Sequence, residues 1–175
     1  MKRSWLIGLL VFAVGFFGGT QFNNTNKNQE KYFVNALRPS ASQMASFALG
    51  KNDAPVLMLN LLKFKDRAEY DDGRDTNVSG RQAYMIYAKE VINHLAKVGA
   101  EPVIAGSINR LILGEVEELW DVAAIARYPS KQAMLEMIMD EEYQQSEKHR
   151  AAGLAGQLNI EITETIFGAE DESET

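Results

Sequence analysis

The side chains that could do chemistry in this sequence are few and far apart. The chain holds two histidines and no cysteine, which excludes disulfides and a cysteine nucleophile and argues against a histidine-rich metal site. One amide, Asn60, and three ionisable groups remain as candidates for catalysis: His94, Arg110 and Arg127. A guanidinium can hold an anionic group and a histidine can move a proton, provided that they converge on one pocket with the amide. No catalytic triad, phosphate-binding loop or metal-ligand spacing occurs, so we expect no metal and no cofactor.

Asn60 lies in the strongest strand signal of the chain, the apolar run from Pro55 to Lys65. Side chains alternate along a strand, so Asn60 shares a face with Met58 and Leu62, whereas the other face carries a row of leucines. If helices cover the leucine face, Asn60 points towards whatever covers the opposite face. A buried amide without partners costs about 1–3 kcal/mol. Asn60 is therefore expected either to make a structural hydrogen bond within the fold or to form the polar floor of a binding cavity.

Seven further elements are predicted around this strand from apolar spacing, capping residues and turn formers. They are helices at 39–50, 79–98, 131–139 and 141–152, and strands at 102–113, 120–128 and 158–167. After the first helix the order is β-α-β-β-α-β, with the last two helices forming one connection. This order predicts an α+β, ferredoxin-like fold, in which a four-stranded antiparallel sheet carries its helices on one face.

The second face of such a sheet would be apolar and open. Val56, Met58 and Phe64 are the residues expected to lie on it, and a contiguous apolar patch of that kind usually marks an interaction surface. Pairing two sheets face to face in a homodimer would cover the patch and enclose a lumen. Asn60 would then be one of the groups that line the lumen.

The ends of the chain differ in composition from the middle. Residues 1–22 begin with Lys2 and Arg3, followed by an apolar run, and are expected to be an uncleaved membrane anchor or a cleaved signal segment. The positive charges place the remaining chain on the extracytoplasmic side of the inner membrane, or in the periplasm or medium after cleavage. Residues 23–38 are interpreted as a polar linker, 39–167 as the folded domain and 168–175 as an acidic, disordered tail.

The net charge of −6 and the absence of a basic stripe argue against a nucleic-acid partner.

Several short motifs, taken in order, resemble the DUF1330 family, a domain of unknown function within the dimeric α/β-barrel superfamily. The motifs are Val56-Leu-Met-Leu-Asn-Leu-Leu-Lys-Phe-Lys65, Tyr84-x-x-Tyr87-Ala88, Val98-Gly-Ala100, Arg127-Tyr-Pro-Ser130, and Glu142-Tyr-Gln144 with the following Arg150. The resemblance covers about residues 54–164, and it departs from the family at Gly99-Ala100, where two glycines are common. It implies that four residues correspond to recurrent family positions: Asn60, Tyr87, Tyr143 and Arg150. With Arg127, these are the candidate ligand-binding residues.

The function that this resemblance implies is open, because the family has no established common reaction. The first hypothesis is a membrane-anchored or exported domain that binds a small apolar or aromatic molecule, or a partner, in the dimer lumen. The alternative is a cofactor-independent small-molecule enzyme of the monooxygenase or isomerase type, by analogy with the superfamily. An envelope structural protein without a ligand is the third hypothesis.

Overall fold

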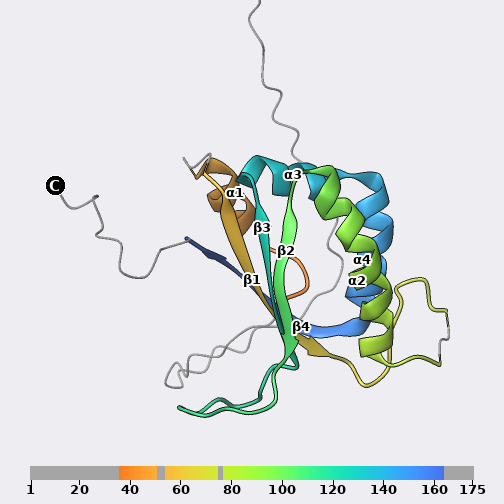
Figure 1. The fold of residues 1–175 in the computed structure, drawn as a ribbon. Coiled ribbons are helices and arrows are strands. Elements are labelled where there is room, and N and C mark those ends of the chain that lie inside the picture. Colours follow the sequence, from red (N-terminus) through yellow and green to blue (C-terminus); the bar gives the residue numbers. More distant parts are fainter. Residues whose placement is uncertain (1–35, 51–53, 75–76, 164–175) are drawn as a thin grey trace, which may run out of the picture. The chain divides into compact units, whose positions relative to one another are not determined.

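The computed structural model describes residues 36–50, 54–74 and 77–163, which form a four-stranded antiparallel sheet with helices (Figure 1). The central strand β1 (Val56–Phe64) pairs with β3 (Val122–Tyr128) on one side and with β4 (Leu154–Ile162) on the other. The fourth strand, β2 (Glu101–Ser107), pairs with β3 and gives the sheet order β2-β3-β1-β4. The apolar run at 55–65 is therefore confirmed as the strand on which the sheet is built.

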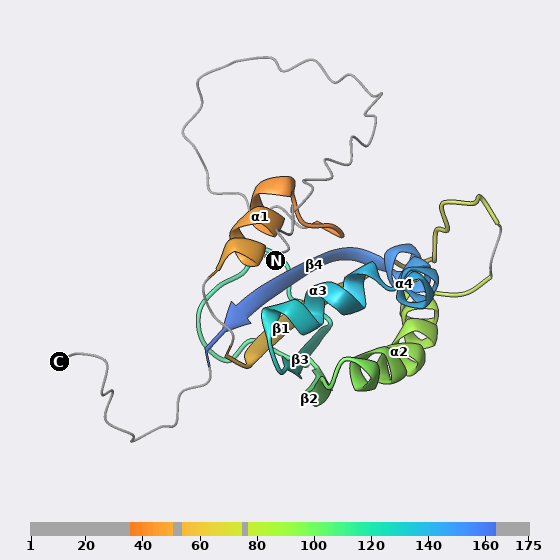
Figure 2. The same cartoon turned by 90° about the horizontal axis from the view of Figure 1, so that it is seen from above.

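The helices connect these strands in the predicted order. Helix α2 (Gly80–Lys97) joins β1 to β2, and the pair α3 (Lys131–Met139) and α4 (Glu141–Gly153) joins β3 to β4. With antiparallel strands in this order, the β-α-β-β-α-β, ferredoxin-like prediction is confirmed. An additional helix, α1 (Ala41–Leu49), precedes the sheet and lies beyond the β4 edge in Figure 2.

Capping side chains explain why the predicted helix starts are accurate. The hydroxyl oxygens of Ser79 and Ser130 accept hydrogen bonds from backbone amides in the first turns of α2 and α3. Asp140 does the same for α4, at the point where α3 ends. Each cap satisfies an amide that has no partner inside its helix, which fixes where the helix begins.

The helices α2 and α4 stand together on one side of the sheet, with α3 across its end (Figure 1). They cover the face of β1 that carries Val56, Met58 and Leu62, which are 3%, 5% and 1% exposed. The expectation that helices cover the leucine face is therefore wrong. The run from 55 to 65 is apolar on both faces, so its alternation does not say which face receives the helices.

The face without these helices carries the leucines of β1 instead. The register places Leu59 beside Ile125 of β3 and Ile160 of β4, and places Ile104 of β2 beside Ile125. We call this surface the open face, and it consists of Ile104, Ile125, Leu57, Leu59, Leu61, Leu158 and Ile160. The prediction that Val56, Met58 and Phe64 lie on the open face is wrong for the same reason. Ile104 is 64% exposed and Ile160 is 40% exposed, so the face is uncovered in the single chain.

Helices α2 and α4 meet at two glycines. A Cβ atom on Gly80 would lie 2.3 Å from the Lys65 carbonyl oxygen, and one on Gly153 would lie 2.4 Å from the Gly80 carbonyl oxygen. The amide of Gly80 donates to the Lys65 carbonyl, and the amide of Lys65 donates to the Gly153 carbonyl. The start of α2, the end of α4 and the end of β1 are therefore joined through backbone atoms, with no room for a side chain.

Several strand ends differ from the sequence prediction. Strand β3 begins at Val122 rather than at 120, and β4 ends at Ile162 rather than at 167. The strand expected at 102–113 ends at Ser107, and the chain then runs out as an extended connection to β3 in which Ile112 and Leu113 are 84% and 90% exposed. The last strand begins at Leu154 rather than at 158, directly after α4. The error at the end of β2 arises because apolar residues continue past the partner strand. The error at the start of β4 arises because α4 passes directly into the strand.

The predictions for residues 1–22 and 168–175 fall outside the described residues, as does most of the linker predicted at 23–38. In the part of the chain that the structure describes, no helix is both long and apolar enough to cross a membrane.

Candidate ligand-binding cleft

A cleft of about 1730 Å³ opens between the sheet and its helices, and its lining extends to residues 36–39, to α1, to the loop at 70–74 and to Ile104 and Ile160 of the open face. On the sheet side it is lined by Met58, Asn60 and Ala124, and on the helix side by residues of α2, α3 and α4. The small side chain of Ala124 lies directly opposite Asn60 in the register, which leaves space above the sheet at this point. The volume exceeds that of an ordinary small-molecule pocket, about 300–1,000 Å³, so a ligand would fill only part of the cleft.

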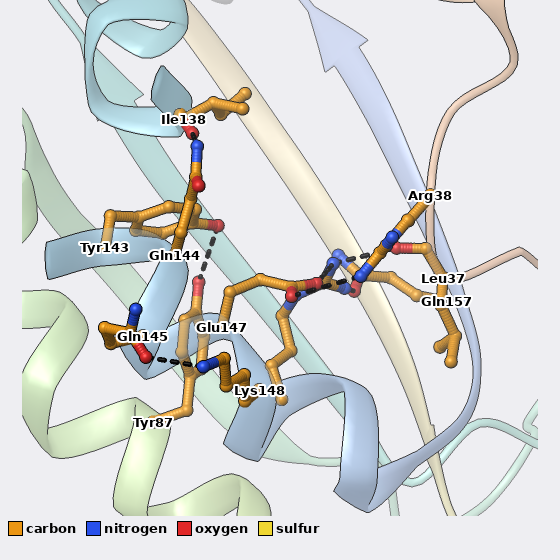
Figure 3. Close-up of polar contacts among 11 residues, drawn as sticks. Leu37, Arg38, Tyr87, Ile138, Tyr143, Gln144, Gln145, Glu147, Lys148 and Gln157 are labelled. Atoms are coloured by element: carbon orange, nitrogen blue, oxygen red, sulfur yellow. Dashed lines mark hydrogen bonds and ion pairs between the residues drawn. The ribbon is translucent and has the colours of Figure 1, made fainter. Parts of the chain in front are cut away.

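Three tyrosines form an aromatic wall on the helix side of this cleft. Tyr84 and Tyr87 lie three residues apart on α2 and therefore on one face of it, and Tyr143 comes from the first turn of α4. The ring centroids of Tyr84 and Tyr87 are 5.5 Å apart, and those of Tyr87 and Tyr143 are 6.2 Å apart. The hydroxyl oxygens of Tyr87 and Tyr143 approach to 3.4 Å (Figure 3). Tyr87 and Tyr143 also belong to the hydrophobic core.

Burial keeps the hydroxyl groups of Tyr84 and Tyr87 protonated. It raises the pKa of Tyr84 to about 12 and holds the pKa of Tyr87 well above its ordinary value, with the nearby Tyr143 adding to the second effect. At neutral pH the wall therefore offers hydrogen-bond donors and no base. An oxygen atom on a ligand is the group that such a wall can recognise.

Asn60 is held by hydrogen bonds on the floor of the cleft. Its Nδ2 donates to the Met58 carbonyl oxygen at 3.1 Å, and its Oδ1 accepts from Gln157 Nε2 of β4 at 2.8 Å. The Gln157 Oε1 in turn accepts from Arg150 Nη1 at 2.5 Å. The expectation of a structural hydrogen bond at Asn60 is confirmed, and the same amide also lines the cleft.

Arg150 connects this floor to the helices and to the start of the described chain. Its Nη2 donates to the Leu37 carbonyl oxygen and to Glu147 Oε1, both at 2.8 Å. Figure 3 shows Leu37, Glu147 and Gln157 gathered around this point. The Arg150 Nε is buried and has no hydrogen-bond partner among the described residues. Arg150 and Glu147 therefore form a nearly buried ion pair that carries one unused donor.

The structure brings four of the five candidate ligand-binding residues to this cleft: Asn60, Tyr87, Tyr143 and Arg150. The fifth, Arg127, faces the other way, because it lies opposite Leu57 in the register and pairs with Glu101 across the open face at 3.2 Å.

The candidates for catalysis do not converge. His94 Nε2 lies 2.9 Å from Ser146 Oγ in the helix layer, and Arg110 is exposed in the connection between β2 and β3. Neither His94 nor Arg110 lines the cleft, and Arg127 does not either. Among the four candidates for catalysis, Asn60 alone lies there.

Three residues of the cleft were not among the candidates predicted from the sequence: Tyr84, Glu147 and Gln157. Glu147 precedes Arg150 by three residues, a spacing that places both on one face of a helix and could have predicted the ion pair. The last strand was predicted to begin at 158, whereas β4 begins at Leu154. Gln157 was therefore not expected to lie on a strand, and its position on the floor could not be anticipated.

The comparisons with known proteins agree with this fold. Residues 74–162 match the family model described as domain of unknown function DUF1330. No curated protein matches the chain. Among solved structures, RPA0582, a protein of unknown function from Rhodopseudomonas palustris, is 29% identical, with a TM-score of 0.69 over 76% of this chain and 99% of that one. Its methylated form is 31% identical, with a TM-score of 0.71 over 78% of this chain and 100% of that one.

A third solved structure is much more distant. It is a dimeric protein of unknown function and ferredoxin-like fold from Bacteroides fragilis NCTC 9343, which is 16% identical over 62% of this chain and 94% of that one, with a TM-score of 0.40. At that distance it carries no information on how this chain assembles. The family model, in contrast, spans half of the chain, and the structural match to RPA0582 covers 99–100% of that protein at 29–31% identity. The chain therefore belongs to the DUF1330 family.

Proposed function

We propose that this domain binds a small apolar or aromatic molecule in the cleft between the sheet and its helices. The observation that carries the proposal is the aromatic wall of Tyr84, Tyr87 and Tyr143, which stands across the cleft from the polar floor at Asn60. Apolar walls with a few placed polar groups are typical of small-molecule sites. The protonated tyrosine hydroxyls and the unused donor of Arg150 favour a ligand with an acceptor oxygen.

This proposal places the ligand within one protomer, and not in a lumen between two sheets. The side chain of Asn60, which the lumen hypothesis relied on, is on the helix-covered face with Met58. A ligand in contact with Asn60 would therefore touch α2 and α4 of the same chain.

An enzyme is the alternative function, and the cleft supports it less well. Such chemistry needs an acid or a base that can exchange a proton with the substrate. Among the described residues, two carboxylates line the cleft near its floor, and both are paired with cations: Glu147 with Arg150 and Arg38, and Glu161 with Lys131. Binding of a ligand without a reaction requires no proton transfer from these side chains.

The test uses 1-anilinonaphthalene-8-sulfonate, an aromatic probe with acceptor oxygens whose fluorescence rises in apolar sites. Ala124→Trp fills the cleft opposite Asn60, whereas Ala123→Trp places the same bulk on the other side of the same strand. We expect Ala124→Trp to weaken probe binding to the full-length chain at least about tenfold, the loss of about 1.4 kcal/mol, and Ala123→Trp to preserve cleft binding. Equal binding by both variants would contradict the proposal, provided that their circular dichroism spectra match the wild type.

We further propose that two chains associate through the open face to form a homodimer. The support is the row of apolar side chains across four strands, Ile104 and Ile160 among them, which is exposed in the single chain. Apolar surface of this kind is unfavourable in water and favours a self-complementary contact.

The N-terminal segment 1–22 is proposed to anchor the chain in the inner membrane or to export it, with the domain outside the cytoplasm. The support is the sequence pattern of Lys2 and Arg3 before an uncharged apolar run. Fractionation of cells that produce the full-length chain tests this proposal. An integral membrane protein that resists alkaline extraction indicates an anchor, a shortened soluble extracytoplasmic chain indicates a signal, and a cytoplasmic chain contradicts both.

A further inference from the structure

A second group of polar side chains lies outside the cleft, where the end of α2 meets the start of α4. One nitrogen of His94 and one carboxylate oxygen each of Asp140 and Glu142 lie within 4.8 Å of one another. His94 belongs to the last turn of α2, Asp140 caps α4, and Glu142 is in the first turn of α4. The end of α2 and the start of α4 thus converge here.

His94 has an unused nitrogen. The residue is only 7% exposed, and its ring packs edge-on against Tyr143 at a centroid distance of 5.7 Å. Its Nε2 lies 2.9 Å from Ser146 Oγ, while its Nδ1 is buried and has no hydrogen-bond partner in the described part of the chain. A buried polar atom without a partner is uncommon and needs an explanation. A histidine whose one ring nitrogen is held by a hydrogen bond presents the other nitrogen to a metal ion.

The neighbouring groups already hold a cation. The Lys97 ammonium contacts Glu142 Oε2, and Asp140 uses its Oδ1 to accept the Tyr143 amide at 2.9 Å. The backbone amide of Glu142 also interacts with the Asp140 carboxylate, as expected for a residue that caps a helix. The cluster therefore combines one imidazole nitrogen with carboxylate oxygens and an electrostatic preference for positive charge.

We propose that His94, Asp140 and Glu142 bind a divalent transition-metal ion, with the Lys97 ammonium moving aside when the ion enters. One nitrogen and two oxygen ligands suit Zn²⁺, Co²⁺ or Mn²⁺, whereas Mg²⁺ and Ca²⁺ prefer oxygen alone. Three protein ligands leave at least one position for water. The bound ion would join the end of α2 to the start of α4, directly behind Tyr143 of the aromatic wall.

The test is a titration of the chelator-treated full-length chain with Co²⁺, followed by its visible absorption, with Zn²⁺ as the competitor. We expect one Co²⁺ per chain, displaced by Zn²⁺. His94→Gln and Glu142→Gln should each weaken binding at least about tenfold, since even a group that only supports a metal ligand is worth 10- to 100-fold. Lys97→Met should bind Co²⁺ more tightly than the wild type, because it removes the competing charge.

Two exposed carboxylates on the first turn of α4 provide the controls for this test. Glu141→Gln removes an exposed carboxylate from the same turn of α4 but lies outside the cluster, so it should bind Co²⁺ like the wild type. Glu142 is exposed, so Glu142→Gln should fold normally even if His94→Gln does not. The proposal is overturned if the wild type binds Co²⁺ no more tightly than Glu142→Gln, or if Glu141→Gln weakens binding as much as Glu142→Gln does.

Discussion

Asn60 owes its position on the floor of the cleft to a partner on the neighbouring strand. Gln157 donates to its Oδ1 at 2.8 Å and at the same time accepts from Arg150, so the three side chains form one chain of hydrogen bonds. Polar side chains in such a network stabilise each other, and removal of one leaves its partner unsatisfied. The amide is therefore as much a structural element as a ligand contact.

The first prediction concerns the link between these two amides. Asn60→Leu and Gln157→Leu should each lower the free energy of unfolding by about 1–2 kcal/mol, because each leaves a half-buried polar partner. The double variant should lose at least about 0.5 kcal/mol less than the sum of the two single changes. Urea unfolding of the four proteins measures this coupling. Strictly additive losses would show that the hydrogen bond contributes nothing to stability.

The second prediction concerns Tyr84 at alkaline pH. Its pKa is raised from 10.0 to about 12 by burial, so between these values the unfolded chain has lost a proton that the folded chain keeps. The stability linked to this proton is complete below pH 10 and is lost as the pH rises towards 12. The loss is about 2–3 kcal/mol, at about 1.4 kcal/mol for each pKa unit.

Tyr84→Phe isolates that contribution, because the other buried tyrosines remain. Urea unfolding at pH 8, 10 and 11 should show a shallower decline for Tyr84→Phe than for the wild type. Identical declines for the two proteins would mean that the Tyr84 hydroxyl titrates as it does in water.

At the scale of the elements, the contact between α2 and α4 controls the geometry of the cleft. Both helices carry tyrosines of the aromatic wall, and they approach each other through Gly80 and Gly153. The backbone of Lys65 at the end of β1 is bonded to both glycines. The width of the cleft at this end is thus set by backbone atoms.

The third prediction tests this contact with Gly153→Ala. The new methyl group would lie 2.4 Å from the Gly80 carbonyl oxygen, so the helices must separate at a cost of about 1–3 kcal/mol or more. The matched control is Gly106→Ala on β2, where a Cβ atom meets nothing within 4 Å and the change should stay within about 0.5 kcal/mol. Urea unfolding measures both. If Gly153→Ala is as stable as Gly106→Ala, the close approach is not tight in solution.

The sequence predicts the elements well where the signal is local. Ser79, Ser130 and Asp140 cap helices at the positions expected, because a cap depends on residues within one turn. The end of β2 at Ser107 and the start of β4 at Leu154 depend on where the partner strands lie, which no local pattern encodes. The residues of the cleft divide in the same way into those that the sequence predicts and those that it does not. Tyr87, Tyr143 and Arg150 follow from a family resemblance, whereas Gln157 joins them only through strand pairing.

At the scale of the whole molecule, the sheet has two apolar faces, of which the helices of the same chain cover one. The face with Met58 is covered by helices of the same chain, and the open face with Ile104 is not. The leucine-rich sequence of β1 predicts that both faces of the sheet are apolar. It does not predict which face the helices cover, because that depends on how the connections cross the sheet. This choice also decides whether the cleft at Asn60 depends on a second chain.

The last prediction therefore separates assembly from binding. Ile104→Asp places a charge on the open face, at a residue that is 64% exposed and so contributes little to the fold of one chain. It should convert the proposed dimer into a monomer in native mass spectrometry, because an unpaired charge buried between two apolar faces costs several kcal/mol. Met139→Asp, at a residue 65% exposed on α3, is the matched control and should leave the dimer intact.

The same pair of variants can then be titrated with the aromatic probe. Because the cleft is lined by α2, α4 and the sheet of one chain, Ala124→Trp should still reduce probe affinity in the Ile104→Asp monomer. Ile104 also lines the cleft, so the comparison is made with and without Ala124→Trp within that monomer. A monomeric wild type would refute the homodimer and leave the cleft untouched. A monomeric variant that no longer responds to Ala124→Trp would instead mean that the ligand site is built between two chains.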